Sequence, residues 1–273
     1  MKIKEKIKSW LIKNVDSRLF ELVSSKYTFT VKVPNNENHV ISDLFPLRIE
    51  NDWNSFFELL NIPRLIDPSS ECVKNNVKFL FFNSDGETIN ECEINIKNEL
   101  KTTINLKELC GKLNISSDGT FAVFHDKVFN NNLIDGSFLA ERGYVGYENK
   151  KLGPIKGYVH GNYDAISSGK NLMLLGVTSF FKKKYNIQYV FDDNFDYEFF
   201  WVNTSDKDLV LKVIEKPGNE NSYIRVSPGG IKSYICKPIK GKNLRNIILE
   251  SKLNMARPII FKYMNKSFDV FHG

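Results

Sequence analysis

The residues best suited to hold a polar substrate lie in one short stretch, YVHGNYDAI, at positions 158–166. Tyr158, His160, Asn162 and Asp164 alternate there, so on an extended chain their side chains project from one face. An aromatic ring, an imidazole, an amide and a carboxylate suit the hydroxyl groups of a sugar or polyol. The pattern therefore predicts a ligand-binding site. Two other interpretations stay open: an acid–base pair of His160 and Asp164, and a Gly-Asn turn with ordinary capping.

A further candidate ligand-binding residue lies upstream, in AERGYVGY at positions 140–147. The planar fork of Arg142 could hold a carboxylate or phosphate through two parallel hydrogen bonds. Arg142 could equally pair with Glu141 or with another surface acid. It is therefore included with the first group as a residue to test, and the same reasoning draws attention to Arg225 and Arg257.

Two nearly identical stretches, FAVFHD at 121–126 and FDVFHG at 268–273, place His125 and His272 at equivalent ends of two expected strands. Each histidine shares a strand face with a Phe and a Val. It is either a satisfied histidine at the edge of an apolar face or a ring nitrogen turned into a ligand pocket. His125 therefore joins the candidate ligand-binding residues. A metal site is not expected, because no acidic or Cys partner stands at ligand spacing.

Known catalytic and cofactor motifs are missing from the chain, so no cofactor is expected. There is no GxSxG, HExxH, GxGxxG or phosphate-binding loop, and none of the four cysteines forms a CxxC pair. The formal net charge of +6 reflects lysines spread along the chain. Because these lysines form no nucleic-acid-binding motif with aromatic residues, nucleic acid is not an expected partner.

The elements that must position these residues are predicted to be mainly β-strands. The chain has 21 Phe and 11 Tyr, and aromatic residues favour half-buried pleated surfaces. VKFLFFN and TINECEINI flank an Asp-Gly turn, and LVLKVIEK precedes SYIRVSPGGIKSYICKP, which has its own Pro-Gly-Gly turn. Short strands with turn signals every 8–12 residues or so are typical of β-sandwiches. KTTINLKEL, at positions 101–109, predicts a further strand. DWNSFFELLNI, by contrast, predicts one or two helical turns capped by Asp52.

We expect two β-sandwich domains, over residues 26–135 and 177–273, that arose from a degenerate duplication. The glycine-rich, aromatic segment 136–176 crosses between them, and its density of glycine indicates tight turns or close backbone approach. The expected ligand-binding site lies where this segment meets the sandwiches.

Residues 1–25 predict an amphipathic helix with lysines over much of its surface. Its apolar positions recur at helical spacing: Ile3, Ile7, Trp10, Leu11, Val15, Leu19 and Leu22. Such a helix could pack on its own domain or a partner subunit, or lie on an anionic membrane surface. No apolar run is long enough for a signal peptide or a membrane span, and the scattered cysteines suit a reducing compartment, so a cytoplasmic location is expected.

The second half resembles the small β-sandwich of the sensory-rhodopsin-transducer family over about 70 residues. The resemblance rests on VNTSDKDLVLKV, IRVSPGGIKSY and ILESKLNMARPIIFKY, which follow a strand–turn–strand order that such domains share. It implies a sandwich that binds partners or small ligands rather than an enzyme. None of the family's functional residues can be transferred to this chain.

Together these patterns predict a non-catalytic β-sandwich protein that binds a small polar ligand, such as a sugar or glycan precursor, or a protein partner. Two alternatives are a carbohydrate-active enzyme that uses His160 and Asp164, and a structural subunit assembled through its N-terminal helix. A cavity around His160 would favour the enzyme, and an oligomer that depends on residues 1–24 would favour the subunit.

Overall fold

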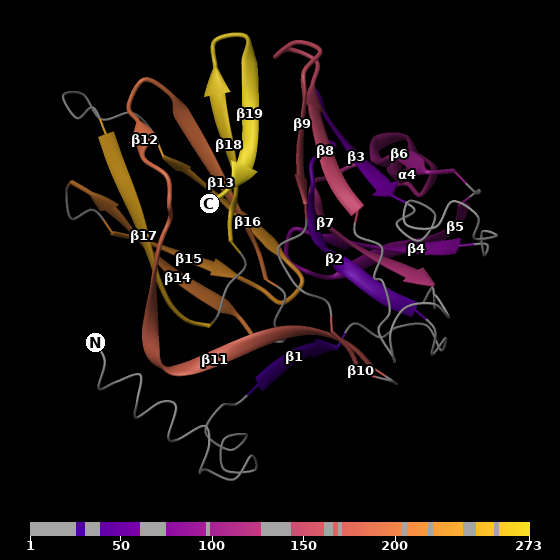
Figure 1. Ribbon diagram of the computed structural model, residues 1–273, viewed down its shortest axis with the longest axis horizontal. Coiled ribbons are helices and arrows are strands. Elements are labelled where there is room, and N and C mark those ends of the chain that lie inside the picture. Colours follow the sequence, from indigo (N-terminus) through magenta and orange to yellow (C-terminus); the bar gives the residue numbers. More distant parts are fainter. Residues whose placement is uncertain are drawn as a thin grey trace.

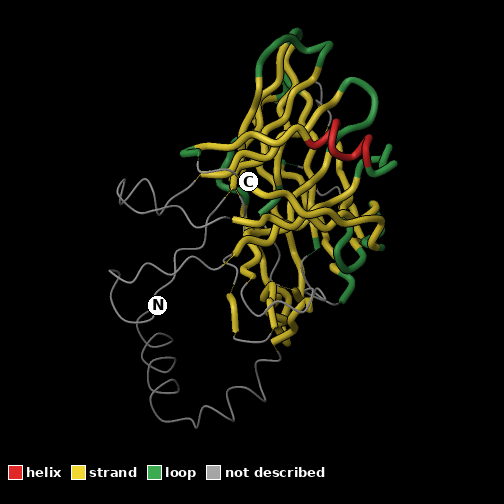
Figure 2. The backbone as a smooth tube through the Cα atoms, turned by 90° about the vertical axis from the view of Figure 1, so that its right-hand side faces the viewer, coloured by secondary structure: helices red, strands yellow, loops and turns green. Residues whose placement is uncertain are grey.

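The computed structural model describes residues 26–30, 39–60, 75–96, 99–126, 143–160, 166–168, 171–203, 207–217, 221–236, 244–253 and 257–273. Most of these residues lie in antiparallel strands, and α4 (Leu106–Lys112) is the one helix among them (Figure 2). The prediction of a mainly β protein is confirmed. The helix predicted over residues 1–25 falls outside the described ranges.

The first group of strands forms two four-stranded sheets. One sheet has the order β2-β7-β4-β5, with bounds His39–Leu47, Gly119–Asp126, Asn75–Asn83 and Thr88–Ile96. The other has the order β6-β3-β8-β9, with bounds Lys101–Asn105, Trp53–Leu60, Gly143–Asn149 and Lys156–His160. The two sheets enclose an aromatic core in which the Phe57 ring lies 5.6 Å from Phe45 and 5.7 Å from Phe79.

The second group also forms two sheets, most of whose strands are drawn on the left of Figure 1. The larger sheet follows β1-β11-β17-β14-β15, with bounds Lys26–Thr30, Asn171–Asn186, Leu244–Leu253, Leu209–Lys216 and Asn221–Val226. Two short strands pair with interior strands of this sheet: β10 (Ile166–Ser168) with β11 and β12 (Phe191–Asp192) with β17. The smaller sheet follows β16-β13-β18-β19, with bounds Ile231–Cys236, Asp196–Val202, Ile259–Met264 and Ser267–His272.

The smaller sheet of the second group is covered by apolar residues on both faces. Ile260 of β18 belongs to the core of the second group, whereas its neighbour Phe261 belongs to the core of the first. Phe268 and Val270 of β19 also pack into the first core. In Figure 1, β19 lies beside β9, and the Cβ that Gly157 lacks would fall 2.3 Å from Cγ1 of Val270. The two groups are therefore packed against each other through β18 and β19.

Strand pairing mixes the ranges that the sequence predicted as domains. β1, at the start of range 26–135, pairs with β11 in the second group. β8 and β9, from the expected crossing segment 136–176, complete a sheet of the first group. The glycine-rich segment thus supplies two full strands of a sandwich.

The repeated motifs occupy different positions in their sheets. FAVFHD forms most of β7, which is flanked on both sides by β2 and β4. FDVFHG begins at the second residue of β19 and ends one residue after it. β19 is an edge strand that pairs with β18. This arrangement adds no support to the predicted duplication.

Two local predictions are wrong. The segment read as helical turns after Asp52 is β3, in which Trp53, Ser55, Phe57 and Leu59 are all buried on one side. β6 and β8 pair with it on both edges, so its backbone hydrogen bonds go to neighbouring strands. KTTINLKEL, expected as one strand, is β6 followed by α4, because the Asn105 side chain caps the helix by accepting from the Glu108 amide.

Candidate functional site

The sequence candidates that the structure describes in full lie on the outer side of the β6-β3-β8-β9 sheet. Alternation along β3, β8 and β9 turns their odd-numbered side chains to the core and their even-numbered ones outward. The register lines up one outward row across the four strands: Thr103, Glu58, Tyr144 and His160. With Lys101, Glu148, Lys156 and Tyr158, this row makes up what we call the tyrosine face.

The Tyr158 ring lies over the backbone of the neighbouring strand. Tyr158 on β9 pairs with Gly146 on β8, and a Cβ added at Gly146 would fall 2.5 Å from Cε1 of Tyr158. The phenol reaches past β8 and donates a hydrogen bond to Oε1 of Glu58 on β3, at 3.0 Å. The ring is therefore fixed at both ends, yet Tyr158 keeps 39% of its surface exposed.

Glu58 is the acceptor that fixes this ring. Its carboxylate pairs with Nζ of Lys101 at 2.9 Å and also accepts from the Thr103 hydroxyl. Burial alone raises the pKa of Glu58, but the hydrogen bonds from Lys101, Tyr158 and Thr103 and the charge of Lys101 outweigh it and lower the pKa. Burial and the Glu58 carboxylate raise the pKa of Tyr158 to about 12. At neutral pH the phenol is thus a donor and Glu58 an ionised acceptor.

The rest of the tyrosine face offers a second ring and balanced charges. Tyr144 is 40% exposed. Nζ of Lys156 lies 3.9 Å above the Phe56 ring and 3.9 Å from a carboxylate oxygen of Glu148. Two lysines therefore accompany two glutamates, so the face is polar without a strong net charge.

His160 joins this face to the last strand. The His160 and His272 ring centroids are 4.7 Å apart, and Nε2 of His272 donates to the His160 carbonyl at 2.7 Å. With Nε2 protonated, Nδ1 of neutral His272 is an acceptor, and this buried atom finds no hydrogen-bond partner among the described residues. Burial lowers the pKa of His272 to about 4. The hydrogen bond to the His160 carbonyl opposes this shift, whereas the charges of His160 and Arg257 add to it.

Because the pKa of His272 is lowered in the folded chain, we expect the free energy of unfolding to fall in mild acid. The unfolded chain binds a proton at His272 near its ordinary pKa of about 6.5, while the folded chain resists it until about pH 4. Stability from neutral His272 is therefore present above that range and lost as pH falls through it. Urea unfolding of wild type and His272→Gln, which keeps a side-chain donor, measures the effect. We expect a shallower pH slope for the variant between the two pKa values, and equal slopes would contradict the assignment.

The other predicted site residues are not placed with this group. His125 lies on β7, where its backbone pairs with Val40 of β2. The His125 side chain lies outside the described part of the structure. Arg142, Asn162 and Asp164 also fall outside the described ranges. Of the six predicted ligand-binding residues, the structure therefore brings together Tyr158 and His160. It adds Tyr144, which belongs to the AERGYVGY stretch, and Glu58, which belongs to the segment that the sequence predicted as helical turns.

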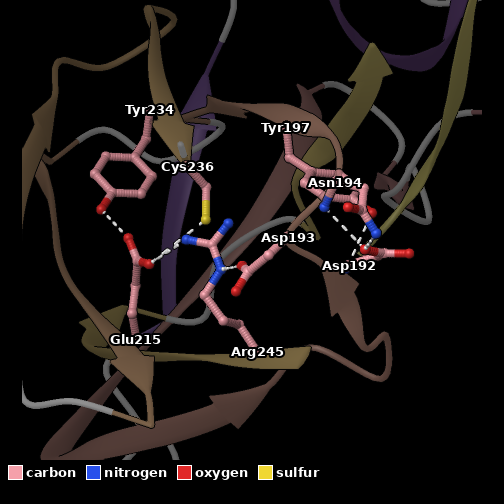
Figure 3. Close-up of polar contacts among 8 residues, drawn as sticks. All are labelled: Asp192, Asp193, Asn194, Tyr197, Glu215, Tyr234, Cys236 and Arg245. Carbon is pink, nitrogen blue, oxygen red and sulfur yellow. Dashed lines mark hydrogen bonds and ion pairs between the residues drawn. The ribbon is translucent and has the colours of Figure 1, made fainter. Parts of the chain in front are cut away.

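A second polar group lies in the second group of strands, where it is buried and not exposed as the tyrosine face is. Arg245 of β17 is 1% exposed and lies between two carboxylates (Figure 3). Its Nη1 donates to Oε2 of Glu215 on β14 at 2.9 Å, and its Nε lies 2.5 Å from Oδ1 of Asp193. The second contact is an ion pair without hydrogen-bond geometry.

Neighbouring side chains complete this buried group. The Tyr234 hydroxyl donates to Glu215, and the Cys236 thiol lies 3.5 Å from the other Glu215 oxygen (Figure 3). Burial, then the Glu215 charge, raises the pKa of Cys236 to about 12, so the thiol stays protonated. A protonated thiol is a poor nucleophile. We therefore assign this group to the architecture of the sandwich.

Metal and membrane-spanning features are not found in the described part of the chain. No three His, Cys, Asp or Glu side chains of the described residues lie together as a metal site. None of the described helices has the length and apolar character to cross a membrane.

Comparison with known proteins assigns no family to this chain. No protein-family model matches it, and no curated protein matches its sequence. Among solved structures, an anti-sigma factor domain-containing protein aligns with 90% of this chain and 88% of its own, at 8% identity and a TM-score of 0.21. A similarity at that level carries no argument about fold or function.

Proposed function

We propose that this protein is a non-catalytic β-sandwich protein that binds a carbohydrate on the tyrosine face. The observation that carries the proposal is the Tyr158 ring, laid over Gly146 and fixed by Glu58 while much of it stays exposed. An aromatic ring held in place before binding loses little conformational entropy when a ligand stacks on it.

The neighbours of this ring suit the chemistry of a sugar. The apolar C–H face of a pyranose can stack on Tyr158 or Tyr144, while its hydroxyls donate to carboxylates and accept from lysines at the ring edges. Glu58 and Lys101 supply one such pair, and Glu148 and Lys156 another. Because the charges balance, the face favours a neutral oligosaccharide over a polyanion.

The chemistry of Glu58 favours binding over catalysis. A glycosidase needs one carboxylic acid that is protonated at the working pH and a second carboxylate placed across the bond. Glu58 has a lowered pKa and is held by Lys101, so it accepts hydrogen bonds rather than supplying a proton. His160 keeps a place at the edge of the face, where it can contact a bound ligand.

A glycan array followed by calorimetry with the best-bound oligosaccharide tests the proposal. Tyr158→Ala and Tyr144→Ala should each weaken binding about fivefold or more, because the stacking of one flat ring on an aromatic side chain, measured for nucleic-acid bases, is worth roughly 1–3 kcal/mol. Gly146→Ala should weaken binding without removing any ring, since the new Cβ displaces Tyr158. His160→Ala should have a smaller effect.

Tyr223→Ala is the matched control, because Tyr223 is also exposed but lies on β15 of the other group. It should bind like wild type. Binding of no glycan at all, or unchanged affinity in both Tyr158→Ala and Gly146→Ala, would refute the assignment. Circular dichroism of each variant confirms that the sheet remains folded.

Three finer features belong to this proposal as predictions: the amphipathic helix over residues 1–25, the degenerate duplication, and the likeness to the sensory-rhodopsin-transducer sandwich. The helix would offer a surface for a protein partner or a second copy. Size-exclusion chromatography of the full chain and of a chain without residues 1–24 tests the association with a second copy, and elution of the full chain as a monomer would exclude it.

A further inference from the structure

The outer side of the β11-β17-β14-β15 sheet carries an excess of positive charge. Strand alternation and cross-strand register turn the described even-numbered side chains of β11, β17 and β14, and the odd-numbered ones of β15, away from the core. Six of the described ones are cationic, and we call them the basic face: Lys182, Lys184, Lys212, Lys216, Arg225 and Lys252. Among the described outward residues of the four strands, Glu250 is the single carboxylate, and Asp208 beside β14 pairs with Arg225.

Register places these charges across neighbouring strands of one surface. Lys184 on β11, Glu250 on β17, Lys212 on β14 and Tyr223 on β15 form one continuous row. Lys182 and Lys252 lie two residues from this row along β11 and β17, and both are exposed. Strands are spaced about 4.8 Å apart, so the cations gather on one patch and not along a single edge.

Exposed apolar groups lie among these lysines. Tyr223 is 69% exposed and Val210, which pairs with Arg225, is half exposed. The half-buried Ile214 and Ile248 are paired across β14 and β17 in the adjacent row. A surface that mixes exposed lysines with a tyrosine and aliphatic side chains can meet both the charged and the apolar layers of a membrane interface.

We propose that the basic face docks this protein on an anionic lipid bilayer. Positive charge in excess of the acids is complementary to an anionic leaflet, which attracts each lysine near its surface. Single-stranded nucleic acid fits less well, because its binding surfaces use several stacking rings and arginine forks. The basic face has one exposed ring, five lysines and one arginine, and that arginine is already paired with Asp208.

Vesicle co-sedimentation with the full chain tests this docking. Vesicles of phosphatidylcholine mixed with phosphatidylglycerol should bind wild type, and pure phosphatidylcholine vesicles should not. The combined variant Lys182→Gln, Lys212→Gln and Lys252→Gln should bind the anionic vesicles about a hundredfold more weakly, since each lysine near such a surface contributes about fivefold. Binding should also weaken from low to physiological salt.

The matched control removes the same charge elsewhere. Lys112, Lys150 and Lys266 are exposed at the end of α4 and in the β8–β9 and β18–β19 turns, away from the basic face. Replacing these three by Gln should leave vesicle binding within about threefold of wild type, because surface charges act over about a Debye length. Equal losses in the two variants would mean that net charge alone is responsible and would overturn the proposal.

Two further outcomes would also overturn it. If the basic-face variant binds vesicles like wild type, attachment comes from another segment, such as the lysine-rich residues 1–25 that every variant retains. If wild type ignores anionic vesicles but binds a single-stranded RNA homopolymer, and the basic-face variant loses that binding, the partner is nucleic acid.

Discussion

Replacing Arg245 by methionine is expected to lower the free energy of unfolding by about 3–5 kcal/mol, the usual cost of removing one member of a buried ion pair. The guanidinium is almost fully buried and compensates Glu215 and Asp193, which stay in the core in the variant. Without it, two carboxylates face each other in a medium of low dielectric. Urea denaturation monitored by tryptophan fluorescence measures the loss.

Two further variants show whether the charge is the cause. Lys184→Met removes a cation whose side chain is 70% exposed and which pairs with Glu250 at 3.2 Å, so it should cost less than about 1 kcal/mol. Adding Glu215→Gln and Asp193→Asn to Arg245→Met should restore part of the lost stability, because the uncompensated charges are gone. A loss for Arg245→Met no larger than that for Lys184→Met would contradict this account.

The turn that carries Asp193 explains how the chain holds a second acid beside the guanidinium. The Asn194 amide and side chain both donate to Oδ1 of Asp192, at 2.8 and 2.7 Å (Figure 3). The Asp192 amide in turn donates to the Tyr197 hydroxyl at 3.2 Å. β12 also pairs with β17 at Phe191 and Arg245, so the turn and the arginine are fixed to the same strand.

Hairpins were the most predictable part of this fold. The Asp85-Gly86 turn has the positive φ that the sequence indicated, with Gly86 at +88° between β4 and β5. LVLKVIEK matches β14 from end to end. These signals are local: a turn residue and a period of two act within a few residues, so no knowledge of distant partners is needed.

The misread segment after Asp52 shows where local pattern fails. Phe56, Leu59 and Leu60 fit a helical stripe, while Trp53, Ser55, Phe57 and Leu59 fit a strand face. Both periods are present, and the choice depends on β6 and β8, which lie 40 residues or more along the chain. Glu58 was missed for this reason, because its contacts with Tyr158 and Lys101 exist only once the strands pair.

The arginines that the sequence singled out are not the arginines that the described structure buries. The sequence drew attention to Arg142, Arg225 and Arg257, yet Arg225 is 72% exposed at the surface. Arg48 and Arg245, which received no attention, are the two buried arginines of the described residues. Their carboxylate partners are 30 residues distant or farther in sequence, so no spacing rule could have paired them.

Arg48 ties the two groups of strands together. It follows β2 in the first group, and its Nη2 pairs with Glu198 of β13 at 3.1 Å while Nη1 donates to the Tyr263 hydroxyl of β18. The guanidinium carbon also lies 3.8 Å from the Trp53 ring centroid and 4.6 Å from that of Phe200. One side chain from the first group thus contacts an acid, a phenol and an aromatic ring of the second.

Arg48→Met should therefore lower the free energy of unfolding by about 3–5 kcal/mol, because Glu198 loses its counter-ion at a mostly buried site. A double-mutant cycle with Glu198→Gln should give a coupling energy of about 1–3 kcal/mol. The control cycle, Arg225→Met with Asp208→Asn, removes an exposed pair and should give less than about 1 kcal/mol. Equal coupling in the two cycles would mean that Arg48 acts through ring packing alone. The expected difference would instead show that the ion pair stabilises the contact between the two groups of strands, in addition to the packing of β18 and β19.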